Sequence, residues 1–175
     1  VGVATGQWSV ISGGGTISAV NSPFTSITNL PVGQNIFQWS VNNGSCGTST
    51  DQVSVFVYDT NNPVANAGPD QNTCTPVTTV NMAGSNVIFP ATGTWTLVSG
   101  SGTITAPGSP STSITGLGVG TNVFQWSVNN GPCGAPTTDL VTINLYDGNA
   151  QPANAGADQS ICSNNPQVTV TGNTP

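Results

Sequence analysis

The chain repeats itself with a period of about 88 residues, and this period constrains the fold more than any other feature of the sequence. The segment Phe37-Gln-Trp-Ser-Val-Asn-Asn-Gly44 recurs unchanged at residues 124–131, and Ala65-Asn-Ala-Gly68 recurs at residues 153–156. A fixed period indicates one folding unit used several times. The sequence therefore predicts the C-terminal part of one repeat at residues 1–62, a complete repeat at 63–150 and the N-terminal part of the next at 151–175.

The two ends of the chain continue the same period. Cys74 precedes Trp95 by 21 residues. Cys162 is followed by 13 residues as far as Pro175, and 8 more lead from Val1 to Trp8, which again makes 21. We therefore expect the chain to be a window in a longer periodic polymer. A unit of this size can fold alone, but its core is modest.

The composition excludes several classes of function. The chain has six aspartates and no lysine, arginine or histidine, so its net charge is −6 at pH 7. Binding to nucleic-acid phosphates or to anionic head groups depends on Lys or Arg, so we expect no nucleic-acid partner. The chain contains no run of 18 apolar residues, so we expect no direct insertion into a membrane. Three aspartates per repeat, without His, Lys or Glu, offer little for acid–base or nucleophilic catalysis, so we expect no enzyme activity and no catalytic residues.

The hydrophobic pattern predicts an all-β fold. Apolar and polar residues alternate with period two between Gly, Pro and Asn, whereas a helical period is missing. Glycines at Ser99-Gly-Ser-Gly102 and Asn129-Asn-Gly131 predict two hairpin turns. Close spacing of strands and turns favours tandem immunoglobulin-like β-sandwich repeats. In the complete repeat, strands are expected near residues 77–82, 94–98, 103–105, 112–115, 122–129 and 140–146.

Aromatic residues recur on the strongest predicted strands. Phe124 and Trp126 are two residues apart, so they share one face of a strand, and Phe37 and Trp39 repeat this arrangement. We interpret these side chains as the domain core. The alternative is an aromatic platform for sugar rings. The full set interpreted as core is Trp8, Phe37, Trp39, Trp95, Phe124 and Trp126.

The four cysteines occupy two positions of the repeat. Cys74 and Cys133 are predicted to form a structural disulfide within the complete repeat, while Cys46 and Cys162 each pair with an adjacent copy. A bridge that closes roughly 60 residues contributes about 4 kcal/mol in the chain-entropy model. Zinc is disfavoured because neither His nor a C-x-x-C spacing is present. The cysteines therefore predict an oxidising, extracellular compartment.

The aspartates recur at intervals of 88 residues and flank two predicted linkers, residues 59–63 and 147–152. Asp59 and Asp70 flank the first linker, and Asp147 and Asp158 flank the second. A calcium ion held by these carboxylates and by nearby carbonyls could stiffen each junction. The alternative is that aspartates cap turns through local hydrogen bonds. Apart from this calcium hypothesis, no cofactor is predicted.

One string of motifs resembles a known type of module. It consists of Ala65-Asn-Ala-Gly-Pro-Asp-Gln71, Cys74, Gly93-Thr-Trp95, Gly116-Leu-Gly-Val-Gly-Thr-Asn-Val-Phe-Gln-Trp126 and Asn129-Asn-Gly-Pro-Cys133. The string resembles the PKD-like or immunoglobulin-like repeats of giant Bacteroidota cell-surface adhesins, including gliding-motility adhesins of the SprB type. The resemblance implies type IX secretion, attachment at the cell surface and a long adhesive filament or stalk. It implies no catalytic residues.

Three functional hypotheses remain at this point. The first is a non-enzymatic structural repeat of an extracellular surface filament that mediates adhesion or gliding, with copies of itself and surface glycans or substrata as partners. The second is an accessory carbohydrate-binding PKD-like region of a secreted polysaccharide hydrolase. The third is a filament subunit in which residues 163–175 complete residues 1–62 of the next subunit by strand donation.

Overall fold

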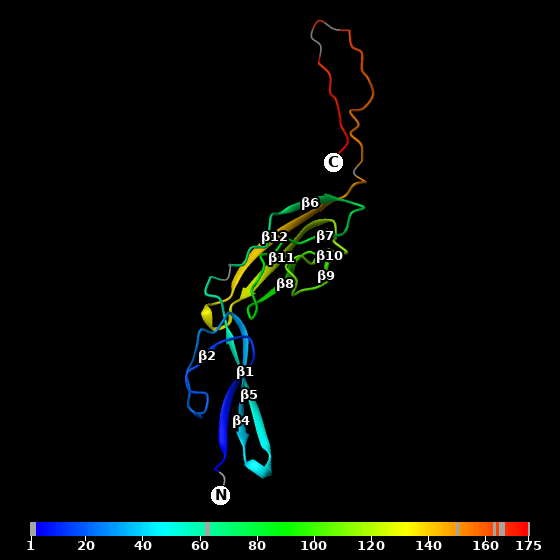
Figure 1. Cartoon of the computed structure of the whole chain (residues 1–175). Coiled ribbons are helices and arrows are strands. Elements are labelled where there is room, and N and C mark those ends of the chain that lie inside the picture. The colour runs from blue at the N-terminus through cyan, green and yellow to red at the C-terminus, as the bar shows by residue number, and fades with distance from the viewer. Residues whose placement is uncertain (1–2, 62–63, 150, 163, 165–166, 175) are drawn as a thin grey trace.

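The computed structural model describes residues 3–61, 64–149, 151–162, 164 and 167–174. In this part of the chain, the regular elements are twelve strands and two single-turn 3-10 helices. They follow one another along an elongated molecule, with the first segment at one end and the complete repeat in the middle (Figure 1). None of the described helices is long and apolar enough to span a membrane.

Residues 64–149 contain seven strands in two facing sheets. One sheet has the order β6-β12-β11-β8, and the other has the order β7-β10-β9. Lettered A to G along the chain, these strands form an A-G-F-C sheet against a B-E-D sheet, which is the immunoglobulin-like arrangement with its first strand on the G edge. The strands are β6 (Gln71–Cys74), β7 (Val80–Asn81), β8 (Thr92–Ser99), β9 (Thr103–Ile104), β10 (Ser113–Thr115), β11 (Gly120–Asn129) and β12 (Thr137–Tyr146).

The first segment repeats the last five of these strands. Its strands are β1 (Thr5–Ser12), β2 (Thr16–Ile17), β3 (Ile27–Thr28), β4 (Gly33–Asn42) and β5 (Thr48–Val57). The sheet β1-β4-β5 corresponds to β8-β11-β12, and the pair β2-β3 corresponds to β9-β10. The register also repeats, because Trp8 lies opposite Trp39 as Trp95 lies opposite Trp126. The tandem organisation thus extends from the sequence to the strand pairing.

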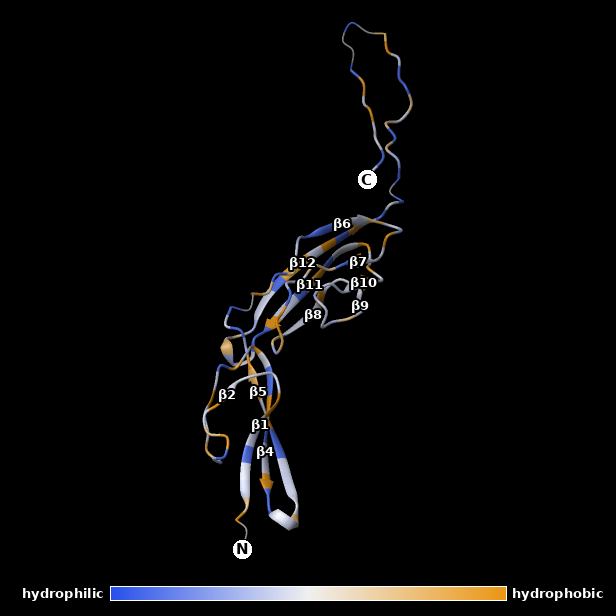
Figure 2. Cartoon of the chain, in the orientation of Figure 1, coloured by the Kyte–Doolittle hydropathy of each residue, from blue (hydrophilic) through white to orange (hydrophobic). Residues whose placement is uncertain are grey.

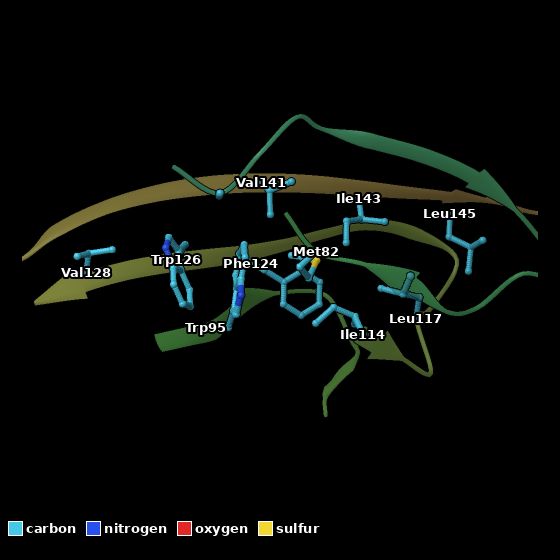
Figure 3. Close-up of a cluster of buried hydrophobic side chains, with 11 residues drawn as sticks. Met82, Trp95, Ile114, Leu117, Phe124, Trp126, Val128, Val141, Ile143 and Leu145 are labelled. Atoms are coloured by element: carbon cyan, nitrogen blue, oxygen red, sulfur yellow. The ribbon is translucent and has the colours of Figure 1, made fainter. Parts of the chain in front are cut away.

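The core of the complete repeat lies between its two sheets (Figure 3). Trp95 and Trp126 are 1% and 0% exposed, and their ring centroids are 5.0 Å apart. Phe124 is fully buried, as is Phe37 in the first segment. Trp8 and Trp39 form the corresponding pair at 5.1 Å, but both are only partly buried. The predicted core residues therefore face the interior more completely in the seven-stranded repeat than in the five-stranded segment.

Two differences between the strand pattern and the sequence prediction change the topology. β6 was not predicted, because Gln-Asn-Thr-Cys has no apolar alternation; it is held by parallel pairing with β12. The segment Ser99–Gly102 was predicted to be a hairpin turn, and this is wrong. β8 pairs with β11 and β9 pairs with β10, so this segment crosses from one sheet to the other. The second predicted turn does connect antiparallel neighbours, β11 and β12.

The predicted domain boundaries stay predictions. Asn62, Pro63 and Ala150, at which they fall, lie outside the described residues. After the second boundary, the described residues of 151–174 form an extended segment that leaves the complete repeat, loops back on itself and carries apolar residues among polar ones (Figure 2). The segment keeps several hydrogen bonds of the complete repeat. The Asn173 N–H donates to the Asn154 carbonyl at 3.0 Å, as Ser85 donates to Asn66 at 2.7 Å. The Gln159 side-chain amide donates to the Thr169 carbonyl at 3.1 Å, as that of Gln71 donates to Asn81 at 3.0 Å.

A buried asparagine, which sequence reasoning missed, ties the loops of the complete repeat together. Asn122 is 2% exposed, and its Oδ1 accepts a hydrogen bond from the Ser101 N–H at 2.8 Å. Its Nδ2 lies 2.9 Å from the Gly118 carbonyl and 3.3 Å from that of Ile143. Asn35, which is 0% exposed, has the same role in the first segment. The sequence carried one signal for this role: an asparagine stands two residues before the phenylalanine of each recurring Phe-Gln-Trp.

We expect Asn122→Asp to destabilise the complete repeat by about 3 kcal/mol, because a buried carboxylate would face carbonyl oxygens and lose the amide donors. Urea unfolding followed by tryptophan fluorescence measures the change. Asn149→Asp adds the same charge at an exposed linker position and serves as the control. Equal unfolding midpoints for the two variants would contradict the assigned role of Asn122.

Candidate functional site: the junction between consecutive repeats

The end of the first segment meets one turn of the complete repeat. This junction comprises Phe56, Tyr58 and Asp59 on one side and Phe89, Asn130, Gly131 and Cys133 on the other. The Asn130 side-chain amide donates to the Asp59 carbonyl at 2.9 Å. The rings of Phe56 and Phe89 meet edge to face, with centroids 6.2 Å apart. Successive repeats therefore touch through specific contacts as well as through the covalent linker.

Gly131 is required at the junction for two reasons. Its φ is +56°, a conformation that side-chain-bearing residues disfavour. A β-carbon placed on it would also lie 2.5 Å from Cζ of Tyr58, so the tyrosine ring rests directly against the backbone of the turn. Asn129 supports the turn by accepting the Gly131 N–H at 2.9 Å. The counterpart Gly44 has the same conformation, but open space surrounds it.

The chain after the junction is fixed to the complete repeat by side-chain hydrogen bonds. The Ala65 N–H donates to Oγ1 of Thr137 at 2.9 Å, and the Ala67 N–H donates to Oδ2 of Asp139 at 2.8 Å. Asp70 continues the series by accepting the Thr142 N–H at 2.8 Å. These bonds lay the Ala65–Asp70 segment along the first half of β12, before the part of the strand that pairs with β6. They explain why aspartates recur at these positions of the repeat.

Asp139→Ala should destabilise the complete repeat by about 2 kcal/mol. Ala67 is 2% exposed, so its N–H would lose its partner away from water. Chemical unfolding of the whole chain measures the difference. The matched control is Asp51→Ala, which removes the counterpart carboxylate from an exposed site on β5 and should change stability by less than about 0.5 kcal/mol. An Asp139→Ala variant with an unchanged free energy of unfolding would refute this role.

The structure does not bring the aspartates of the calcium hypothesis together. Asp59 accepts the Asn61 N–H at 2.8 Å, and Asp147 accepts the Asn149 N–H at 2.9 Å, so both cap turns locally. Asp70 lies alongside β12 instead, and Asp158 is exposed in the extended segment. Among the residues that the structure describes, no group of three metal-ligating side chains occurs. Turn capping is therefore the interpretation that the geometry favours for Asp59 and Asp147.

The predicted disulfide between Cys74 and Cys133 is wrong. Cys74 lies in register with Tyr146, at the last residue of β12, whereas Cys133 precedes the first residue of that strand by four positions. At about 3.3 Å per residue, the ten-residue strand alone separates them by roughly 30 Å. A disulfide needs Cα atoms about 4.4–6.8 Å apart. All four cysteines, Cys46, Cys74, Cys133 and Cys162, are free and exposed in this structure.

The aromatic residues do not form a sugar platform on the complete repeat. Trp95 and Trp126 are buried, and their indole N–H groups donate to the Ser109 carbonyl at 3.1 Å and to Ser85 Oγ at 3.2 Å. Rings enclosed in this way have no free face for a ligand. The alternative of a Trp95 or Trp126 platform is therefore wrong.

A shallow hollow of about 220 Å³ opens at the junction. Apart from Asn130 and Cys133, the residues that line it are small, apolar or hydroxyl-bearing. It contains no carboxylate, so it presents no acid–base pair for chemistry. The junction is suited to hold repeats in a fixed order along an axis. The residues that line the hollow are Thr60, Val64, Val128, Asn130, Cys133, Gly134, Ala135 and Thr137.

Fold and junction together define a class: an all-β chain of immunoglobulin-like repeats joined end to end. No family model and no curated protein matches the chain. Among solved structures, it is similar to the PKD domain from the KIAA 1837 protein, with 24% identity, coverage of 50% of this chain and 90% of that domain, and a TM-score of 0.43. The PKD domain of human KIAA0319 is similar at 20% identity, with 50% and 84% coverage and a TM-score of 0.41.

A third similar structure comes from a bacterium. It is a SusE-like surface located polysaccharide binding protein from the heparin utilisation locus of Bacteroides thetaiotaomicron. The identity is 13%, the match covers 80% of this chain and 29% of that protein, and the TM-score is 0.35. The assignment of the immunoglobulin-like arrangement rests on the order and direction of the strands.

Proposed function

We propose that the chain is a non-enzymatic structural segment of a long extracellular filament or stalk that mediates adhesion at the cell surface. The observation that carries the proposal is the direct contact between successive repeats, in which Tyr58 packs on Gly131 and Asn130 bonds to Asp59. Each repeat that is added through such a junction extends the filament along one axis. A filament of this kind presents binding surfaces far from the cell and allows many weak contacts to act together.

The charge of the chain suits this role. Its six aspartates and the lack of any cationic side chain leave no means of electrostatic attraction between copies or to anionic polymers. Adhesion by this segment would then rely on specific contacts with surface glycans or substrata. Its other partners are copies of itself along the filament. Export by type IX secretion and a contribution to gliding belong to the same proposal, through the resemblance to Bacteroidota adhesin repeats.

A second candidate, the strand-donating subunit, is favoured by the exposed faces at the two unfinished repeats. Val53 is 44% exposed on β5, whereas its counterpart Val141 is fully buried. Val170 is 73% exposed in the extended segment, whereas its counterpart Met82 is 3% exposed. The two exposed apolar sets would cover each other if residues 151–174 joined residues 3–61 of another copy. The same contact between residues 151–174 and the next residues 3–61 would form in a covalent array of repeats and in a filament of separate subunits.

Two measurements on material from the source cells test the proposal. Antibodies against the 175-residue chain should label fibres that project from the cell surface, and Fab fragments should reduce attachment of the cells. Denaturing mass analysis should detect a very large polypeptide. A discrete species of 17.5 kDa would favour the strand-donating subunit. Label confined to the cell interior, or unchanged attachment with saturating Fab, would contradict the proposed function.

A further inference from the structure

We propose that Cys74 forms a disulfide with the cysteine in the β11–β12-type turn of the following repeat, so that each junction is covalently stapled. The inference rests on the proposed tandem array. Its starting point is that the two cysteine positions of the repeat lie at opposite ends of the same domain, where each faces a neighbouring repeat rather than the other cysteine.

Cys74 lies at the end of the complete repeat from which the chain leaves for the next one. It pairs in register with Tyr146, the last residue of β12. The following residue, Thr75, accepts the Gly148 N–H on Oγ1 at 2.8 Å, and its N–H donates to the Tyr146 carbonyl at 2.9 Å. Cys74 therefore sits beside the first residues of the outgoing linker, and its side chain is exposed.

Cys133 lies at the other end, beside the incoming linker. It is the last residue of the short 3-10 helix Gly131–Cys133, and it lines the junction hollow together with Thr60 and Val64. Gly131, two residues earlier, is the residue on which Tyr58 packs. The turn cysteine of a repeat is thus placed against the end of the preceding repeat.

The internal repeat shows what these two positions face in an array. Tyr58 and Tyr146 are equivalent, 88 residues apart, and so are Thr60 and Gly148. At the second junction, Cys74 lies beside Tyr146, and Thr75 lies against Gly148. At the first junction, the turn that carries Cys133 contacts Tyr58, and Cys133 lines the junction hollow together with Thr60. Both cysteines therefore approach the same tyrosine and the same linker residue, one from each side of a junction.

The exposure of the two tyrosines agrees with this placement. Tyr146 is 56% exposed, whereas Tyr58, against which the Gly131 turn packs, is partly buried. The neighbouring aspartates differ in the same way, since Asp147 is exposed and Asp59 is partly buried. The end of the complete repeat thus presents an open surface where its counterpart carries the turn of the next repeat. The turn that would fill it brings a cysteine at the position of Cys133.

The reaction is a thiol–disulfide exchange with a disulfide donor of the oxidising compartment, either a protein dithiol oxidase or a small oxidised thiol. The thiolate of one cysteine attacks the donor disulfide, forms a mixed disulfide and releases one donor thiolate. The thiolate of the second cysteine then attacks the sulfur of the first and releases the other donor thiolate. Two protein thiols are oxidised, one donor disulfide is reduced, and the two protons end on the donor thiols.

The test uses two copies of the whole chain joined end to end, which keeps the 88-residue register across the join. All cysteines are changed to serine except Cys74 of the first copy and Cys46 of the second copy. After equilibration with oxidised and reduced glutathione, thiol titration and mass analysis of chymotryptic peptides should find an internal disulfide in at least nine of ten molecules. A control fusion keeps only Cys74 and Cys133 of the first copy, and it should keep free thiols.

Small-angle scattering on the same samples separates failure of the staple from failure of the array. An extended fusion with free Cys74 and Cys46 thiols would overturn the staple and leave the proposed filament standing. An internal disulfide in the control fusion would also overturn it, because that bond demands that the two ends of one repeat approach each other. A compact or unfolded fusion would overturn both the array and the staple that depends on it.

Discussion

Two copies of the chain joined end to end should show two populations of β4 peptides in hydrogen exchange, equal in size, with exchange rates about 100-fold apart. In the second copy, β4 belongs to a repeat completed by residues 151–174 of the first copy. In the first copy, β4 remains in a five-stranded segment. Peptides from β11, which belongs to a complete repeat in both copies, should show a single slow population. Mass spectra of deuterated peptides measure these populations directly.

The size of the effect follows from the surface that is still open in the first segment. Trp8 and Trp39 are partly buried there, and Val53 is 44% exposed, whereas their counterparts Trp95, Trp126 and Val141 are at most 1% exposed. Covering roughly 120 Å² of apolar surface contributes about 3 kcal/mol. Because amide exchange in a core strand follows the free energy of opening, this corresponds to about two orders of magnitude in rate.

A second fusion provides the control for this experiment. In it, residues 151–174 of the first copy are replaced by a glycine–serine linker of equal length. The slow β4 population should disappear, while the β11 peptides should stay protected. A single β4 population in the intact fusion would mean that the two unfinished parts do not build one repeat, and the tandem interpretation would then be wrong.

Gly93→Ala should destabilise the complete repeat by about 3 kcal/mol, although it adds only one methyl group. A β-carbon at this position would lie 2.2 Å from Cζ2 of Trp126, and that ring is fully buried. Trp126 cannot move away easily, because it packs on Trp95 and its Nε1 donates to Ser85. Overpacking of a rigid core typically costs about 1–3 kcal/mol, and loss of the Ser85 bond would add to this.

Urea unfolding of the 175-residue variants gives the free-energy difference, with Gly134→Ala as the matched control. Gly134 has an extended backbone, and open space surrounds its α-carbon, so alanine should be tolerated. Adding Trp126→Phe to Gly93→Ala should recover part of the loss, because a smaller ring leaves room for the methyl group. Additive losses in the double variant would show that the two side chains do not compete for the same space.

The sequence was sufficient for the fold where apolar alternation and recurrence coincide. The Phe-Gln-Trp-Ser-Val strand and the Asn-Asn-Gly turn predicted β11 and its connection to β12, because period-two burial and left-handed glycine conformations are local properties. The sequence was not sufficient for β6, whose polar residues pair through the backbone with residues 72 positions later in the chain. It also failed at Ser99–Gly102, because glycines mark a sharp change of direction but do not say which sheet the chain enters.

The cysteine pairing shows a further limit of sequence reasoning. Cys74 and Cys133 were predicted to bond because they are the two cysteines of the complete repeat, but pairing depends on which end of the sandwich each residue occupies. That position is set by the parallel register of β6 on β12, a contact for which the sequence carries no local signal. The role of Asp139 as a hydrogen-bond acceptor for Ala67 depends on the same edge and was equally hidden.

Small-angle X-ray scattering from fusions of one, two and three copies tests the end-to-end array most directly. Each copy contains two repeat lengths, and a ten-residue strand with its turns spans about 40 Å, so the maximum dimension should rise by about 80 Å with each added copy. Equal increments would support repeats held in line by junctions such as Tyr58 on Gly131. A maximum dimension that grows only as the cube root of mass would show collapse into a globule and would contradict the account.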